Sequence, residues 1–469
     1  MPRLRPSAPA ALLACGALLA PAVSRAQPVL RAAHDHGAAP LSTAGLRGKI
    51  AELFIFGPGQ DPLFLAGSAG STNPASVQAH GTHFIPSAAA SNGSIIGFIG
   101  QALGTSVASI PIGATTSGET FRFEGGVPVS TATSAGPIFA ERAQTLGRGR
   151  VLAGVNRSSF NFSTIRGVPL RDVQVTFTHE NTNAAGCAAE NGGQDCAQYG
   201  VPVLENEVMQ VSLDLDIDVA VTSFYVTYGI TDRVDFGVAV PVLQNSFRGT
   251  SSAQILPFGG GNAVHFFAGT PQNPVLQASR TTTGRAFGIG DVAARLKVNA
   301  ASGPRTGVAF LLDARFPTGE VENLMGTGEF VGRGMAIVSS RFGNFSPHAN
   351  AGYLYRADRE LATDAVLATL GFDQLLGKGV TMAADVLSEL QVGSNRLELP
   401  RTVQFDAPFR RTVDPTNIPE MRDDVVNGSF GFKFTGASRV TAIANALFPL
   451  NDGGLRSRTT FTFGVEYSF

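Results

Sequence analysis

The sequence contains no tryptophan and few charged residues, and past its first apolar segment it has no long hydrophobic run. Only 15% of its 469 residues are Asp, Glu, Lys or Arg, a smaller share than soluble enzymes usually carry. No later stretch reaches the roughly 20 apolar residues of a membrane-spanning helix. The net charge of −1 gives no basic surface for nucleic acid. These absences argue against helical spans, whereas low charge and 55 glycines are typical of a membrane β-barrel rich in turns.

Cysteine is also scarce, with three in the chain. Cys15 lies in the N-terminal apolar stretch, which leaves Cys187 and Cys196 in a glycine-rich segment. In an oxidising compartment these two are expected to form one disulfide that closes a loop. A metal site would need further ligands, and none is adjacent to the two cysteines. We therefore expect no metal and no cofactor.

The N-terminus has the pattern of a secretory signal. Arg3 and Arg5 precede the apolar stretch, and the small-residue site Ser24-Arg25-Ala26 follows it. Residues 1–26 are therefore predicted to be removed in export. The run Leu12-Leu13-Ala14-Cys15 also resembles a lipobox, so a lipid-anchored Cys15 is an alternative.

The last eleven residues alternate strictly, with an apolar side chain at every odd position from Phe461 onwards and an aromatic residue at the end. Alternate side chains of a strand point to opposite faces, so one face of this strand suits lipid and the other a wet lumen. Tyr467 and Phe469 resemble the sorting signal that outer-membrane proteins present to the barrel-assembly machinery. This ending predicts location in the outer membrane of a Gram-negative-type bacterium.

Working backwards from Phe469, short and long connections alternate, as they do in bacterial barrels with short periplasmic turns. We predict an all-β fold, a transmembrane antiparallel β-barrel of about 14 strands, with 12 to 16 possible. Residues 131–148 are expected to form a long outer loop, and Thr164 to Pro169 a periplasmic turn. The predicted strands are 119–130, 149–162, 170–180, 207–229, 233–248, 285–298, 305–317, 333–342, 345–356, 364–375, 379–392, 424–435, 439–449 and 458–469.

The pattern divides the chain into a signal peptide at 1–26, a periplasmic lead with a lumen plug at 27–118, and the barrel at 119–469. Within the second part, Ser94 to Leu103 is predicted to be a short apolar helix. It is too short to span a bilayer, and a barrel of this size has a lumen wide enough to hold it. We therefore expect this N-terminal segment to fill the barrel.

Charged residues of the predicted strands gather on one face of each strand, which we assign to the lumen. Opposed charges are expected to form hydrogen-bonded networks there, since a bare buried charge is costly. Three acids on one face of 207–229 allow a cation site as an alternative to pairing with neighbouring cations. The candidate lumen-lining residues are Asp214, Asp216, Asp218, Asp291, Arg295, Lys297, Asp313, Arg315, Asp385, Lys433 and Glu466.

Four motifs resemble outer-membrane proteins described as "putative MetA-pathway of phenol degradation", which are related to long-chain fatty acid and toluene transporters. They are the hairpin Ser223 to Pro241, Gly288-Ile289-Gly290-Asp291-Val292 with Lys297, Phe316 to Glu320, and Phe448 to Arg456. The resemblance implies a barrel that takes up hydrophobic solutes, and it supplies no catalytic residue. We expect no enzyme.

In the related transporters, solutes leave the lumen sideways where a strand is kinked. The resemblance makes two positions candidate wall kinks here: Thr222, where the apolar register slips, and Pro241, which cannot donate to the ladder. The function expected is passive uptake of small hydrophobic or aromatic compounds, with a structural or surface-interaction barrel as the alternative. Expected partners are outer-membrane lipid and lipopolysaccharide, the barrel-assembly machinery and the solutes.

Overall fold

The computed structural model describes residues 45–56, 121–124, 127–130, 134–178, 207–257, 266–270, 272–358, 362–395, 399, 402–405, 410–436 and 439–469. The predicted signal peptide, the predicted helix at Ser94 to Leu103 and the pair Cys187 and Cys196 lie outside these residues. Among the residues described, no helix is both long and apolar enough to cross a bilayer.

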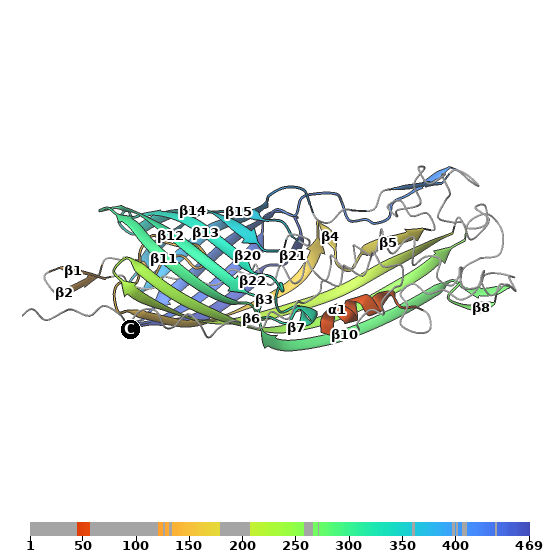
Figure 1. Ribbon diagram of the computed structural model, residues 1–469, viewed down its shortest axis with the longest axis horizontal. Helices are drawn as coiled ribbons and strands as arrows, with labels where there is room; N and C mark the ends of the chain where they lie inside the picture. Colours follow the sequence, from red (N-terminus) through yellow and green to blue (C-terminus); the bar gives the residue numbers. More distant parts are fainter. Residues whose placement is uncertain are drawn as a thin grey trace, which may run out of the picture. The chain divides into compact units, whose positions relative to one another are not determined.

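Twelve antiparallel strands form a closed barrel (Figure 1). Closure joins the first strand to the last, where Val151 and Phe469 exchange two backbone hydrogen bonds of 2.8 and 2.9 Å. In order along the chain, the barrel strands are β3 (Val151–Ile165), β6 (Val208–Thr231), β7 (Val234–Leu256), β11 (Val292–Ser302), β12 (Thr306–Phe316), β13 (Val331–Ser340), β14 (Phe345–Arg356), β15 (Ala365–Gly377), β16 (Val380–Gln391), β19 (Val425–Thr435), β20 (Val440–Pro449) and β22 (Thr460–Ser468).

Shorter elements surround this barrel. Four strands extend the same sheet: β4 (Val168–Pro169), β5 (Val173–Thr178), β10 (Gln277–Ile289) and β21 (Leu455–Ser457). Three separate hairpins join β1 (Phe121–Glu124) to β2 (Val127–Ser130), β8 (Ala268–Thr270) to β9 (Asn273–Val275), and β17 (Val403–Phe405) to β18 (Arg411–Val413). The described helices are α1 (Gly45–Ala51) and the single 3₁₀ turns η2 (Glu52–Phe54) and η4 (Val321–Asn323).

The barrel is confirmed, but its strand number is the lower bound of the predicted range. The predicted strand 119–130 is the separate β1–β2 hairpin. The predicted strand 170–180 became β5, which pairs with β6 only beyond the end of the barrel. The predicted strand 285–298 is divided between β10 and β11. Alternation identified these segments as strands without showing which partner each would find.

Short turns lie at the end of the barrel that holds Phe469, as predicted, and this end is periplasmic because both ends of an even-stranded barrel lie there. The β6–β7 and β15–β16 turns each have two residues between their strands. In the second, Gly379 has a φ of +74°, a conformation that glycine adopts without steric cost. The predicted periplasmic turn at Thr164 to Pro169 is wrong. It lies at the opposite end, because β3 starts beside Phe469 and runs outward.

Strands β6 and β7 continue far past the barrel as a paired ribbon, flanked by β5 and β10 (Figure 1). Odd-numbered residues of β6 face inward over its whole length, and the pairing of Thr222 with Val242 is regular. The predicted register slip at Thr222 is therefore wrong. What changes there is the chemistry of the two faces.

Within the barrel, the outer face of β6 is apolar and its inner face is polar. Past the barrel, the outer face is polar and the inner face is apolar. Phe224 and Val226 are about half exposed on the outer face, whereas the outward positions farther along the ribbon are Asp214, Asp216 and Asp218. The exchange marks the level at which lipid gives way to water, since charged side chains are costly against hydrocarbon. At this level the Arg157 guanidinium donates to Thr222 Oγ1 and Gln244 Oε1 at 2.9 and 2.8 Å.

Apolar side chains form a belt around the outside of the barrel. Leu370 is 69% exposed and Phe463 61%, values expected only where lipid covers them. Tyr228 and Tyr467 lie at the periplasmic edge and Tyr353 and Tyr355 toward the outer edge. Phenylalanine and tyrosine thus replace tryptophan in the interfacial aromatic girdles. The protein is an outer-membrane β-barrel.

Candidate functional site: the interior of the barrel

Residues Ser134 to Leu146 run through the lumen, and we refer to this segment as the plug. They precede β3 and form no strand or helix. Their hydrogen-bond partners come from β7, β11, β13, β15 and β16, all around the wall. Only a segment inside the barrel can reach all of these strands. The prediction of 131–148 as a long outer loop is therefore wrong for the described residues of that range.

An ion pair between the plug and β15 is fully enclosed. The Arg142 guanidinium donates to both carboxylate oxygens of Asp373, through Nε to Oδ1 at 2.9 Å and through Nη2 to Oδ2. The Asp373 side chain has no exposed surface, and that of Arg142 is 9% exposed. Ser134 Oγ also donates to Asp373. Asp373 thus fixes two points of the plug, and bidentate guanidinium pairs of this kind are strong and directional.

A second group of contacts joins the plug to β11 and β7. Glu141 lies between Lys297, with Nζ to Oε2 at 3.2 Å, and Arg295 at 3.9 Å. Asn299 donates to the Ala143 carbonyl at 2.7 Å, and the Asp235 carboxylate accepts from the Leu146 amide at 2.9 Å. Each charge in this dry interior has an opposite charge or a hydrogen-bond donor, as buried charges require.

Farther around the wall, charges of the strands also pair with one another. Asp313 accepts from Arg295 at 2.6 Å and from Arg333 at 3.2 Å, and Arg315 lies 3.6 Å away. On the opposite side, Tyr225 donates to Glu466 at 2.7 Å, and Lys433 lies 3.8 Å from the same carboxylate. His348 Nε2 and Asp385 Oδ1 are 2.7 Å apart. The inner face of the barrel wall is therefore polar and cross-linked by charge.

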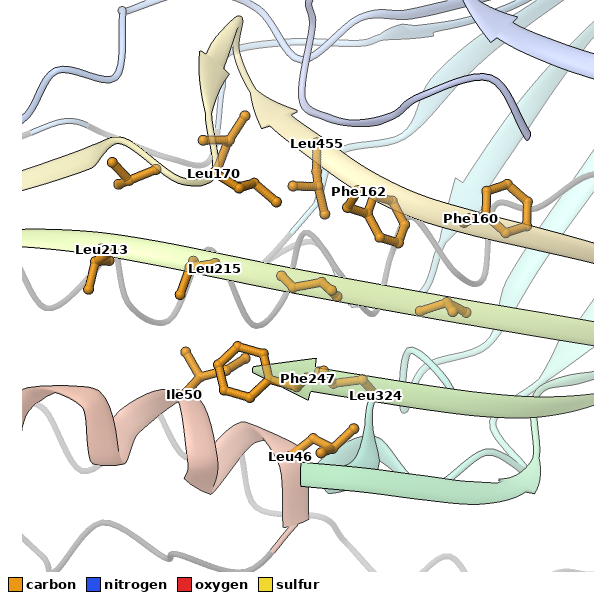
Figure 2. Packing of buried hydrophobic residues seen from close by; sticks show 14 of the residues in the cluster. Leu46, Ile50, Phe160, Phe162, Leu170, Leu213, Leu215, Phe247, Leu324 and Leu455 are labelled. Atoms are coloured by element: carbon orange, nitrogen blue, oxygen red, sulfur yellow. The ribbon is translucent and has the colours of Figure 1, made fainter. Parts of the chain in front are cut away.

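The outer part of the interior is apolar on the side of β3, β6 and β7. Inward side chains of β3 and β6, among them Phe160, Leu215 and Val221, join one buried cluster that extends to Ile138 and Phe139 of the plug. Figure 2 shows this cluster, with Leu213 and Leu215 of β6 opposite the side chains of α1 and β7. Apolar contact thus runs without a break from the ribbon to the plug.

The ladder along β7 is irregular where β10 gives way to β11, and we call this point the break. Both strands pair with β7, but the register shifts by one residue between Ile289 and Ala293. Pro241 faces the break and contributes its carbonyl to the Gly290 amide at 2.8 Å. Pro241 is thus at the break, whereas Thr222 is not. A proline suits the site because the ladder needs no donor there.

The loop from Pro317 to Phe330, which we call the covering loop, is tied to this break. The Asp291 carboxylate accepts from the Gly319 amide at 3.0 Å and from the Thr327 amide at 2.9 Å. Asn245 of β7 donates to the carbonyls of Asn323 and Leu324, both at 2.9 Å. At the end of the loop, burial raises the pKa of the Glu329 carboxyl. The hydrogen bond from the Asp358 amide and the charge of Arg356 act in the opposite direction, and burial is the larger effect.

The predicted lumen residues therefore separate into two sets. Asp214, Asp216 and Asp218 lie on the outer face of the ribbon, so their prediction as lumen-lining is wrong. Asp214 is 63% exposed and 4.0 Å from Arg171, and Asp218 accepts from Asn161 at 2.8 Å. The rest are buried: Arg295, Lys297, Asp313, Arg315, Asp385, Lys433 and Glu466 on the inner face of the barrel, and Asp291 at the break.

Sequence reasoning missed the plug side of these contacts. Glu141 and Arg142 are adjacent charges in an otherwise apolar segment, which is a signal for buried pairing, but nothing in the sequence names their partners. Asp235 and Asp373 could have been found, because each is the charged residue on the polar face of an alternating strand.

At the predicted sorting signal, the rings of Tyr467 and Phe469 stack with centroids 5.5 Å apart.

Comparison with known proteins confirms the family resemblance over part of the chain. A family described as "Putative MetA-pathway of phenol degradation" matches residues 201–386. A search of curated proteins gave no match.

Among solved structures, an outer membrane channel from Pseudomonas putida F1 aligns at 10% identity, covering 70% of this chain and 98% of that one, with a TM-score of 0.39. A Pseudomonas aeruginosa FadL homologue aligns at 10% identity over 68% and 90%, with a TM-score of 0.30. The P. putida toluene transporter TodX aligns at 10% identity over 68% and 89%, with a TM-score of 0.29.

Proposed function

We propose that this outer-membrane barrel is a channel for passive uptake of small hydrophobic or aromatic compounds. The observation that carries the proposal is the apolar part of the interior beside β3, β6 and β7, which continues from the ribbon to Ile138 and Phe139 of the plug. A hydrophobic solute would find there a medium like itself, at the height where the surrounding membrane presents a polar lipopolysaccharide surface. The toluene transporter TodX is among the structural neighbours.

The solute would leave sideways, at the break between β10 and β11. Beyond the apolar part, the plug and the buried charge pairs block the lumen for an uncharged molecule that cannot replace their contacts. Beside the break, the outer faces of Phe287 and Ile289 are 70% and 53% exposed. The solute could thus pass from the interior to lipid without entering bulk water.

A matched pair of variants at one level of β6 tests this path. Val221 faces the apolar interior, and its neighbour Thr222 faces outward. Whole-cell uptake is the suitable assay, because intact lipopolysaccharide slows hydrophobic solutes that cross phospholipid vesicles unaided. We expect toluene uptake to exceed that of cells lacking the protein, to fall several-fold in Val221→Gln and to be unchanged in Thr222→Gln. An amide left without a partner in an apolar path costs on the order of 1–3 kcal/mol. Equal uptake with and without the protein would overturn the proposal.

The second candidate is a structural or surface-interaction barrel without a solute. It is supported by the number of polar contacts that hold the plug to the wall of the lumen. Uptake of small sugars in the same assay would be a third outcome and would indicate a general pore. Lipopolysaccharide and the barrel-assembly machinery remain proposed partners in either case.

A further inference from the structure

Residues Gly45 to Phe56, which include α1 and η2, lie in the trough formed by the inner faces of β7 and β10. Leu46, Ile50, Leu53 and Phe54 are each no more than 3% exposed. Figure 2 shows Leu46 and Ile50 directed toward Phe247 of β7 and Leu324 of the covering loop. This segment therefore occupies the apolar surface that the proposed solute path requires.

The trough is shaped for this segment. A Cβ atom on Gly284 of β10 would come within 2.5 Å of Leu46, and one on Gly249 of β7 within 2.7 Å of Leu53. Thr282 donates to the Lys49 carbonyl at 2.8 Å, and Ser251 donates to the Leu53 carbonyl. Two glycines and two hydroxyl groups thus match the segment in shape and in hydrogen bonding.

The same segment also touches the covering loop. A Cβ on Gly45 would lie 2.6 Å from the carbonyl oxygen of Glu322, so the two backbones are in close contact. The covering loop is in turn held to the break by Asp291 and Asn245. Movement of α1 can therefore alter the break through the covering loop, which contacts both.

The helix cannot hold this position by its own stability. It has seven residues, well below the roughly 12 to 15 that an isolated helix needs to be even marginally stable in water. It is helical because the trough holds it. The apolar part of its contact with the trough comes from a few side chains, and a small apolar molecule can replace those apolar contacts.

We propose that Gly45 to Phe56 is a built-in occupant of the solute path, which a small uncharged hydrophobic molecule must displace before uptake. The inference rests on the proposed function. When the segment leaves, the covering loop loses its contact at Glu322, so entry of the solute and release of the loop are coupled.

A disulfide that locks the helix in place tests the inference. In a Cys187→Ser/Cys196→Ser background, the pair Leu46→Cys/Gly284→Cys would join α1 to β10. The matched control is Thr250→Cys/Thr281→Cys, which joins β7 to β10 on the exposed outer face, where the two hydroxyl oxygens are 3.0 Å apart. We expect oxidation to reduce toluene uptake at least tenfold in the first pair, reduction to restore it, and the control pair to transport in both states. Full uptake by the oxidised first pair would overturn the inference.

A labelling experiment separates this inference from the proposed function. With Leu46→Cys alone in the same background, we expect maleimide labelling to be slow, and several-fold faster when toluene is added. If wild-type cells take up toluene and labelling does not respond to it, the built-in occupant is wrong while the channel stands. If labelling responds but no uptake is seen, the channel is wrong and displacement by an apolar ligand stands. If neither responds, both are wrong.

Discussion

Removing the Arg142 side chain should release the plug. In Arg142→Ala the Asp373 carboxylate would lose its bidentate partner while remaining buried at the wall. Breaking a buried ion pair by deleting one partner costs about 3–5 kcal/mol, and each 1.4 kcal/mol is about tenfold in an equilibrium constant. The undocked fraction of the plug should therefore rise by about two to four orders of magnitude, less if water enters and solvates Asp373.

Planar-bilayer conductance measures that fraction directly, because an undocked plug leaves a polar, water-accessible lumen. We expect brief openings in Arg142→Ala that are rare in the wild type. Arg148→Ala is the matched control, since Arg148 lies in the same connection but is exposed. The double variant Arg142→Met/Asp373→Leu should close the channel again, because it leaves no unpaired charge. If Arg142→Ala conducts no more than Arg148→Ala, the ion pair does not hold the plug.

Three further predictions concern the membrane level, the break and the covering loop. Val226→Arg should lower the unfolding free energy in vesicles by roughly 2–4 kcal/mol and Ser212→Arg by close to none; equal losses would refute the assigned level. Asp291→Ala should make the covering loop cleave faster in limited proteolysis, and an unchanged rate would show that Asp291 is not its anchor. Burial raises the pKa of Glu329, so its ionisation disfavours the folded state and stability falls as pH rises through its titration. Glu329→Gln should make the melting temperature depend less on pH. A Glu329→Gln variant less stable than wild type at neutral pH would contradict this prediction.

The sequence predicts the barrel strands well wherever both faces of a strand have one environment along its length. The strands β12, β14 and β20 begin and end within one residue of the predicted bounds. The error at Asp214, Asp216 and Asp218 has a clear cause: the alternation was right, but polar was equated with lumen. That rule holds only where lipid surrounds the strand, and these residues lie beyond the lipid, where water reverses it.

The plug could not be predicted because nothing local determines it. Ser134 to Leu146 has no helical or strand period, and its contacts are far away in the chain: Ser134 and Asp373 are 239 residues apart. Side-chain alternation assigned Asp313 and Lys433 to the face that the structure buries. It could not show that Asp313 holds three arginines of its own wall.

The closing contact between β22 and β3 also sets an order of assembly. It joins the first and last strands of the barrel, for example through the hydrogen bond between the hydroxyl groups of Ser158 and Thr462, which are 304 residues apart in the chain. Such distant pairings form late, because the entropy of closing the intervening chain must be lost first. The plug is attached directly to the start of β3, and it contacts strands that are synthesised long after it. We therefore expect the ring of strands to close around the plug during folding, so that insertion into the membrane and filling of the lumen are one event.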